Sequence, residues 1–154
     1  MKKLLLLISL FTYQLQAQKS AITPKNVEKH VAFLASDELK GRGTGTKDEQ
    51  KAADYIAKHF KSLGLAPKGT NGFEQPFKAN IDTVHAVDAR NVVAYLDNGA
   101  DRTIVIGAHY DHLGEGYQRG SLEANSKGKI HNGADDNASG VAGVLELARY
   151  YAKN

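Results

Sequence analysis

Apolar residues recur at three- and four-residue spacing in three stretches of the chain, which predicts three amphipathic helices. The helices are expected at residues 24–35, 47–63 and 138–153. Thr23 is a favourable N-cap for the first helix, and Pro24 suits its first position because proline has no N–H to satisfy there. Thr46 and Glu49 form a capping box at the start of the second helix, and Gly64 ends it.

Shorter extended segments lie between the second and third helices. Asn91–Leu96 and Thr103–Ala108 are expected to be strands, which the Asp97–Gly99 turn could join as a hairpin within a mixed sheet. Thr103–Ala108 is apolar on both faces, which indicates a central, buried strand. No internal repeat or linker divides the chain, so we expect a single domain.

The first 17 residues have the pattern of a secretory signal peptide. Lys2 and Lys3 are positively charged, Leu4–Phe11 is an apolar run interrupted only by Ser9, and Ala17 suits a cleavage site. The apolar run is too short to span about 30 Å of hydrocarbon as a stable anchor. We therefore expect an exported bacterial protein, periplasmic or secreted, without a membrane anchor.

The charge balance and the absence of cysteine narrow the functional classes. The chain has 20 Lys and Arg against 17 Asp and Glu, and removal of Lys2 and Lys3 leaves 18 against 17. Such a nearly neutral mature chain offers no electrostatic basis for binding nucleic acid or a membrane surface. Because the sequence contains no Cys, any metal ion must be held by His and carboxylate side chains.

A cluster of candidate metal ligands follows the predicted strand Thr103–Ala108. His109 and Asp111 point the same way if the chain is extended, so Asp111 could orient a metal-ligating His109. Asp135 and Asp136 precede the third helix, where adjacent buried carboxylates would repel each other unless a cation neutralised them. Two simpler alternatives remain: the first pair could merely cap a strand, and the second could cap the helix.

A loop with alternating glycines separates the first two helices and contains Gly41, Gly43 and Gly45. A phosphate-binding loop is one interpretation of such a segment. We reject it because no strong strand precedes the loop and no Lys–Ser or Lys–Thr pair ends it.

Two motifs together resemble the family-28 zinc metallopeptidases, in particular the dizinc aminopeptidases of the bacterial leucyl aminopeptidase type. The motifs are GAHYDHLG at residues 107–114 and IHNGADDNASGVAG at residues 130–143, and LASDELKGRGTGT at residues 34–46 also resembles the family. The resemblance implies an α/β fold with three α/β/α layers around a mixed, largely parallel central sheet. Residues 18–154 would form the N-terminal part of a single domain of this zinc-exopeptidase type.

The resemblance also implies roles for individual residues. His109 would ligate one Zn²⁺ ion, Asp135 would bridge two Zn²⁺ ions, and Asp111 would orient His109. The peptide bond between Asp135 and Asp136 would be cis. These assignments make the segment from His109 to Asp136 part of a metal-dependent hydrolase site.

The implied activity is that of an aminopeptidase, which uses two metal ions to hydrolyse the first peptide bond of substrates with a free N-terminus. A glutamate general base, a glutamate ligand, an aspartate ligand and a final histidine would lie beyond Asn154, so the chain alone is expected to be inactive. His112 and His131 have no implied ligand role; they could line the pocket, but we interpret them as loop residues. Two alternatives remain open: a single-zinc cyclase or carboxypeptidase relative, and an exported binding domain that has lost the site.

Overall fold

The computed structural model describes residues 21–118 and 120–154. The expected signal peptide at residues 1–17 therefore lies outside the described residues. Within them, the chain forms three α-helices: α2 (Pro24–Leu34), α3 (Lys47–Ser62) and α4 (Ser139–Lys153). These bounds confirm the three helices predicted from the spacing of apolar residues. None of the described helices is long and apolar enough to cross a membrane.

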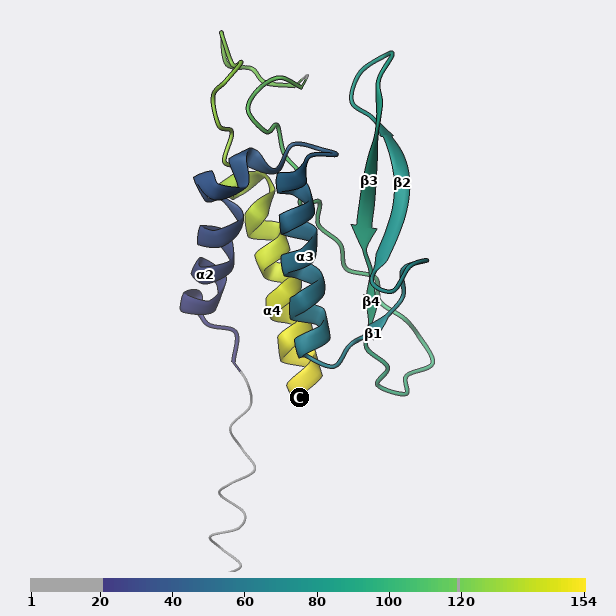
Figure 1. Cartoon of the computed structure of the whole chain (residues 1–154). Coiled ribbons are helices and arrows are strands. Elements are labelled where there is room, and N and C mark those ends of the chain that lie inside the picture. The colour runs from purple at the N-terminus through teal and green to yellow at the C-terminus, as the bar shows by residue number, and fades with distance from the viewer. Residues whose placement is uncertain (1–20, 119) are drawn as a thin grey trace, which may run out of the picture.

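The three helices lie side by side and bury their apolar faces against one another (Figure 1). Leu34 from α2, Ile56 and Phe60 from α3, and Leu145 from α4 belong to one buried cluster. Leu39 joins them from the short 3-10 helix Asp37–Arg42 (η2), which connects α2 to the glycine-rich loop. The hydrophobic core therefore lies between the helices, directly beneath the loops that carry the candidate site.

Two small antiparallel sheets lie beside α3 (Figure 1). β2 (Glu74–Asn80) pairs along its whole length with β3 (Ala86–Val92), and β1 (Ala66–Pro67) pairs with β4 (Ala94–Tyr95). The β2–β3 hairpin contacts α3 through β3. The predicted strand Asn91–Leu96 is thus divided between the end of β3 and β4.

The predicted pairing of Thr103–Ala108 is wrong. This segment forms no hairpin with Asn91–Leu96 and carries no strand pairing in the described part of the chain. Ile104 and Val105 are 85% and 90% exposed, whereas a central strand would bury both faces. A parallel strand needs a neighbour brought alongside by a long crossover connection, and the residues that the structure describes supply none. The fold class is α/β, but these residues form only small antiparallel sheets.

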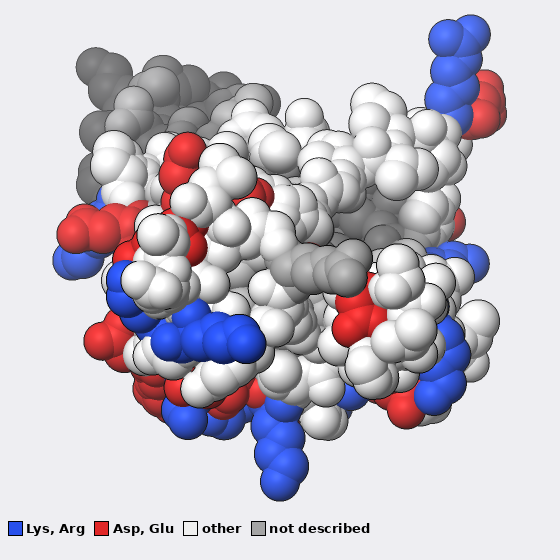
Figure 2. Space-filling model, turned by 90° about the horizontal axis from the view of Figure 1, so that it is seen from above, with Lys and Arg blue, Asp and Glu red and all other residues white. Residues whose placement is uncertain are grey.

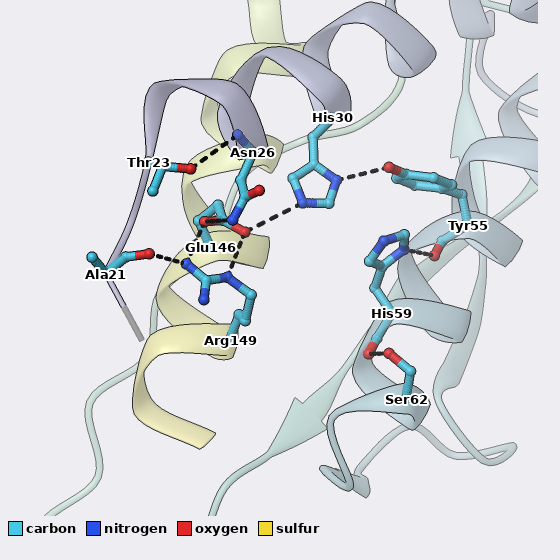
Figure 3. A network of polar contacts seen from close by, with 9 residues as sticks. All are labelled: Ala21, Thr23, Asn26, His30, Tyr55, His59, Ser62, Glu146 and Arg149. Carbon is cyan, nitrogen blue, oxygen red and sulfur yellow. Dashed lines mark hydrogen bonds and ion pairs between the residues drawn. The ribbon is translucent and has the colours of Figure 1, made fainter. Parts of the chain in front are cut away.

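A polar network lies where α2, α3 and α4 meet (Figure 3). His30 is 6% exposed; its Nδ1 lies 2.7 Å from the Tyr55 hydroxyl, and its Nε2 faces Glu146 Oε1 at 3.6 Å. Glu146 accepts hydrogen bonds from Arg149 at 2.9 and 2.7 Å and from Asn26 at 3.3 Å. Each oxygen of the buried carboxylate therefore has a donor, which removes the penalty of burying it unpaired.

Acidification is expected to weaken the fold through His30. Burial, together with the nearby His59, lowers the pKa of His30 below its ordinary value of 6.5. The unfolded chain then binds a proton more readily than the folded chain, so the free energy of unfolding falls as pH drops below about 6.5. Glu146 contributes to the same loss of stability at lower pH. The hydrogen bond from Arg149 lowers the pKa of Glu146 from 4.5, so protonation of this carboxylate also favours the unfolded chain.

Urea unfolding at about pH 7.5 and about pH 5.5 measures this effect. The wild-type protein should lose stability at the lower pH, and His30→Gln should lose less between the two conditions. Equal losses in the two proteins would show that His30 does not carry the dependence.

Candidate metal site

Residues from two distant segments meet at the end of the extended stretch 103–108. His109 Nε2 lies 2.9 Å from Asp136 Oδ1. His109 Nδ1 faces Asp111, at 3.1 Å from its carbonyl oxygen and 3.4 Å from Oδ1. If Nδ1–H donates to Asp111, the neutral ring presents an unprotonated Nε2 to Asp136. A nitrogen lone pair and a carboxylate oxygen approach this closely only when a proton or a cation lies between them.

The structure places Asp136, rather than Asp135, beside His109. The Asp135 carboxylate makes no ion pair or hydrogen bond with His109 in the described residues, and its backbone carbonyl accepts a hydrogen bond from Ser139 Oγ at 2.9 Å. The expected cis peptide bond is also one residue displaced, and joins Asp136 to Asn137. The sequence shows two adjacent carboxylates, but only the backbone path of the turn determines which of them faces the histidine.

The turn Ala134–Ala138 (η3) directs the Asp136 side chain. Asn137 takes the capping role at the start of α4, because its Oδ1 accepts a hydrogen bond from the Gly140 N–H at 3.2 Å. Gly133 enters the turn with a φ of +59°, and a Cβ there would lie 2.5 Å from the Asp136 carbonyl oxygen. Glycine is therefore required at this position. With Asn137 capping the helix, the Asp136 carboxylate is available to face His109.

The two other histidines of the region differ in their distance from this site. His112 Nδ1 lies 3.7 Å from Asp136 Oδ2, and burial lowers the pKa of His112, which favours its neutral form. His131 is held within its loop, with Nε2 2.8 Å from Ser121 Oγ and Nδ1 2.8 Å from the Lys129 carbonyl oxygen. His131 is therefore the loop residue that we predicted, whereas His112 lines the site.

Two residues that we did not single out from the sequence also contact the site. Thr44 Oγ1 donates a hydrogen bond to Asp111 Oδ2 at 2.7 Å. The Arg42 guanidinium donates to the carbonyl oxygens of Tyr110 and Gly133, at 2.8 and 2.9 Å. Both residues belong to the glycine-rich loop, which we had rejected as a phosphate site and noted otherwise only as part of the family-like segment at residues 34–46.

The donor atoms suit zinc, although the described residues supply only part of a coordination shell. Two ligands of a tetrahedral zinc ion, each at about 2.0 Å, lie about 3.3 Å apart. The 2.9 Å between His109 Nε2 and Asp136 Oδ1 is close to that separation. In residues 21–118 and 120–154, no group of three or more His, Asp or Glu side chains is arranged to hold a metal ion. His109 and Asp136 therefore fit zinc as two ligands of a larger set.

Acidic and basic side chains are interspersed on the face seen in Figure 2, which views the molecule from the end that carries the site loops. Neither sign of charge forms a continuous patch on this face. The distribution agrees with the near balance of 20 basic and 17 acidic residues in the whole chain.

Residues 91–154 match the family described as Peptidase family M28. The match includes His109, Asp111 and Asp136. Over these residues the chain is similar to peptidase family M28. The M28 segment thus begins near the end of β3 and continues through α4, and it contains both segments that meet at the candidate site.

Curated relatives match a larger part of the chain. The "Alkaline phosphatase isozyme conversion protein" of Escherichia coli (strain K12) is 33% identical over 124 residues, which cover 78% of this chain and 34% of that protein. A "Probable zinc metalloprotease" of Pyricularia oryzae (strain 70-15) is 31% identical over 149 residues, covering 90% of this chain and 28% of that protein. The chain thus spans about a third of the length of these relatives.

A solved structure shares the fold. The glutaminyl cyclase of Porphyromonas gingivalis superposes with a TM-score of 0.62 at 21% sequence identity, over 86% of this chain and 41% of that chain. At this identity the likeness shows the fold alone. It agrees with the α/β, zinc-exopeptidase architecture expected from the sequence motifs.

Proposed function

We propose that this chain is part of a zinc-dependent aminopeptidase, which hydrolyses N-terminal residues from peptides by means of two zinc ions. The observation that carries the proposal is the approach of His109 Nε2 to Asp136 Oδ1 at 2.9 Å, with Asp111 beside the other ring nitrogen. The M28 match of residues 91–154 and the zinc metalloprotease relative support it. Because the chain spans about a third of its relatives, the activity of the whole protein is part of the proposal.

Each residue of the site has a separate task in this account. His109 would hold zinc through Nε2. Asp111 would orient the ring, because its carbonyl oxygen lies 3.1 Å and its Oδ1 3.4 Å from His109 Nδ1, and such a contact fixes the tautomer and raises the basicity of the ligand. Asp136, rather than Asp135, to which we had assigned the bridging role, would be the carboxylate that holds zinc, because its Oδ1 faces His109 while its Oδ2 faces His112. Zinc bound there would supply Lewis-acid chemistry, polarising the peptide carbonyl and acidifying water at neutral pH.

The proton-transfer step requires a further group. His109, Asp111 and Asp136 are committed to binding or orienting, so none of them is free to act as the general base. By the family resemblance we expect this base to be a glutamate, which would lie outside the described residues. The proposal therefore treats the described chain as the part that orients metal ligands and not as the complete catalytic apparatus.

We further propose that the protein is exported to the periplasm or secreted and acts on peptides or proteins with a free N-terminus. The signal-peptide pattern of residues 1–17 supports export, and the near-neutral mature charge favours neither nucleic acid nor a membrane surface as a partner.

Hydrolysis of aminoacyl p-nitroanilides by the complete gene product tests the proposed function. We expect activity that a zinc chelator abolishes and that added Zn²⁺ restores, because the metal polarises the scissile carbonyl. Activity that persists in the presence of chelator would contradict the proposal. A peptide with N-terminal glutamine separates the alternatives, since an aminopeptidase releases free glutamine, whereas a cyclase releases ammonia and leaves the peptide bonds intact.

A further inference from the structure

The glycine-rich loop Gly41–Thr46 contacts both segments that carry the candidate site. Its Gly41 carbonyl accepts a hydrogen bond from the Gly114 N–H at 3.0 Å, and the Arg42 carbonyl accepts one from the His112 N–H at 3.0 Å. A Cβ on Gly41 would lie 2.4 Å from the His131 carbonyl oxygen and 2.5 Å from that of Gly114. The missing side chain therefore lets the loop approach the two segments closely.

We propose that this loop is the positioning element of the metal site: Thr44 orients the Asp111 carboxylate, and Arg42 fixes the separation of the His109 and Asp136 segments. The inference rests on the proposed metal site and deepens it. It also gives a function to a sequence feature that neither the M28 match of residues 91–154 nor the phosphate-loop interpretation explains.

Thr44 acts on the carboxylate that faces His109. Its hydroxyl donates to Asp111 Oδ2 at 2.7 Å, and the other oxygen, Oδ1, lies 3.4 Å from His109 Nδ1. With one oxygen held by Thr44, rotation of the Asp111 carboxylate is restricted, so the second oxygen stays directed at the imidazole. Asp111 in turn keeps His109 Nε2 directed at Asp136.

The side chain of Gln118 holds the Thr44 backbone in place. The Thr44 N–H donates to Gln118 Oε1 at 3.2 Å, and Gln118 Nε2 donates back to the Thr44 carbonyl at 2.9 Å. This two-way amide contact fixes the backbone from which the hydroxyl projects. The Thr44 hydroxyl therefore donates from a fixed position, as it must if it is to orient the Asp111 carboxylate.

Arg42 joins the two ligand segments through backbone carbonyls. Its side chain is fully buried, and it donates to Tyr110 O at 2.8 Å, Asn132 O at 2.7 Å and Gly133 O at 2.9 Å. Tyr110 lies between His109 and Asp111 in the chain, and Gly133 enters the turn that carries Asp136. One planar guanidinium thus connects the backbones on both sides of the site, a geometry that its fork of N–H groups favours.

Metal binding by variants of Thr44 tests the proposal in the complete gene product. After removal of zinc with a chelator, Co²⁺ is titrated in, and its dissociation constant and visible absorption spectrum are recorded. Thr44→Val keeps the shape but removes the hydroxyl, and we expect it to weaken Co²⁺ binding about 10- to 100-fold, the range for lost outer partners of metal ligands. Thr44→Ser restores the donor and should bind within about threefold of wild type.

Thr23→Val is the matched control, because Thr23 lies outside this loop and its Oγ1 accepts the Asn26 N–H at 3.3 Å as the N-cap of α2. This variant should lower thermal stability and leave Co²⁺ affinity and spectrum unchanged. Wild-type affinity in Thr44→Val, or equal weakening in Thr44→Val and Thr23→Val, overturns the positioning role while the proposed function stands. Failure of the wild-type protein to bind Co²⁺ or Zn²⁺ overturns both.

Discussion

Asp136→Asn is expected to lower zinc-dependent peptide hydrolysis by the complete gene product by about 100-fold or more. The amide keeps the size of the side chain but removes the charge that faces His109 Nε2 at 2.9 Å. Loss of a metal ligand removes several kcal/mol of transition-state stabilisation, and each ~1.4 kcal/mol is a factor of ten in rate. The quantity to measure is kcat/KM for an aminoacyl anilide at a fixed zinc concentration.

Asp135→Asn is the control for this prediction, because it changes the adjacent carboxylate in the same turn. The structure gives Asp135 no contact with His109 among the described residues, so this variant should stay within about threefold of wild type. If Asp135→Asn loses activity and Asp136→Asn keeps it, the bridging role returns to Asp135, as the family resemblance first suggested.

Arg42→Met is expected to lower the free energy of unfolding by about 3 kcal/mol or more. The buried guanidinium donates to the carbonyl oxygens of Leu34, Tyr110, Asn132 and Gly133. A methionine of similar length would leave these acceptors without that donor, and a buried polar group that loses its partner costs about 1–3 kcal/mol. Urea unfolding followed by circular dichroism measures the difference.

Lys40→Met is the matched control for the Arg42 variant. Lys40 lies two residues earlier, in the same segment Asp37–Arg42 (η2), its side chain is 53% exposed, and its contact with Glu115 is a 4.0 Å surface pair. Removal of such a pair should change stability by less than about 0.5 kcal/mol. Similar unfolding midpoints for the Arg42 and Lys40 variants would contradict the account of Arg42 as a buried connector.

The helices could be predicted because their determinants are local. Thr23 and Thr46 cap α2 and α3 as the sequence indicates, and each helix buries the apolar face that its spacing defines. The partners of Thr103–Ala108 could not be predicted in the same way. Strand pairing depends on which segments the chain brings alongside, and neither the turn residues nor the apolar pattern of this segment contains that information.

The candidate site was predictable only in part, for a related reason. His109 and Asp111 could be found because side chains at positions i and i+2 of an extended chain point to the same side. The choice of Asp136 over Asp135 depends on backbone angles within one turn, where Asp136 and Asn137 depart from helical geometry. Thr44 meets Asp111 across 67 positions of sequence, so no spacing rule identifies that contact.

The zinc content of the complete gene product tests the central claim most directly. After dialysis against metal-free buffer, elemental analysis should find about two zinc ions per wild-type chain, as the proposed two-metal mechanism requires. His109→Ala and Asp136→Asn should each lose bound zinc, whereas Asp135→Asn should retain it. Wild-type zinc content in both His109→Ala and Asp136→Asn would show that these two side chains do not hold the metal, and would contradict the account.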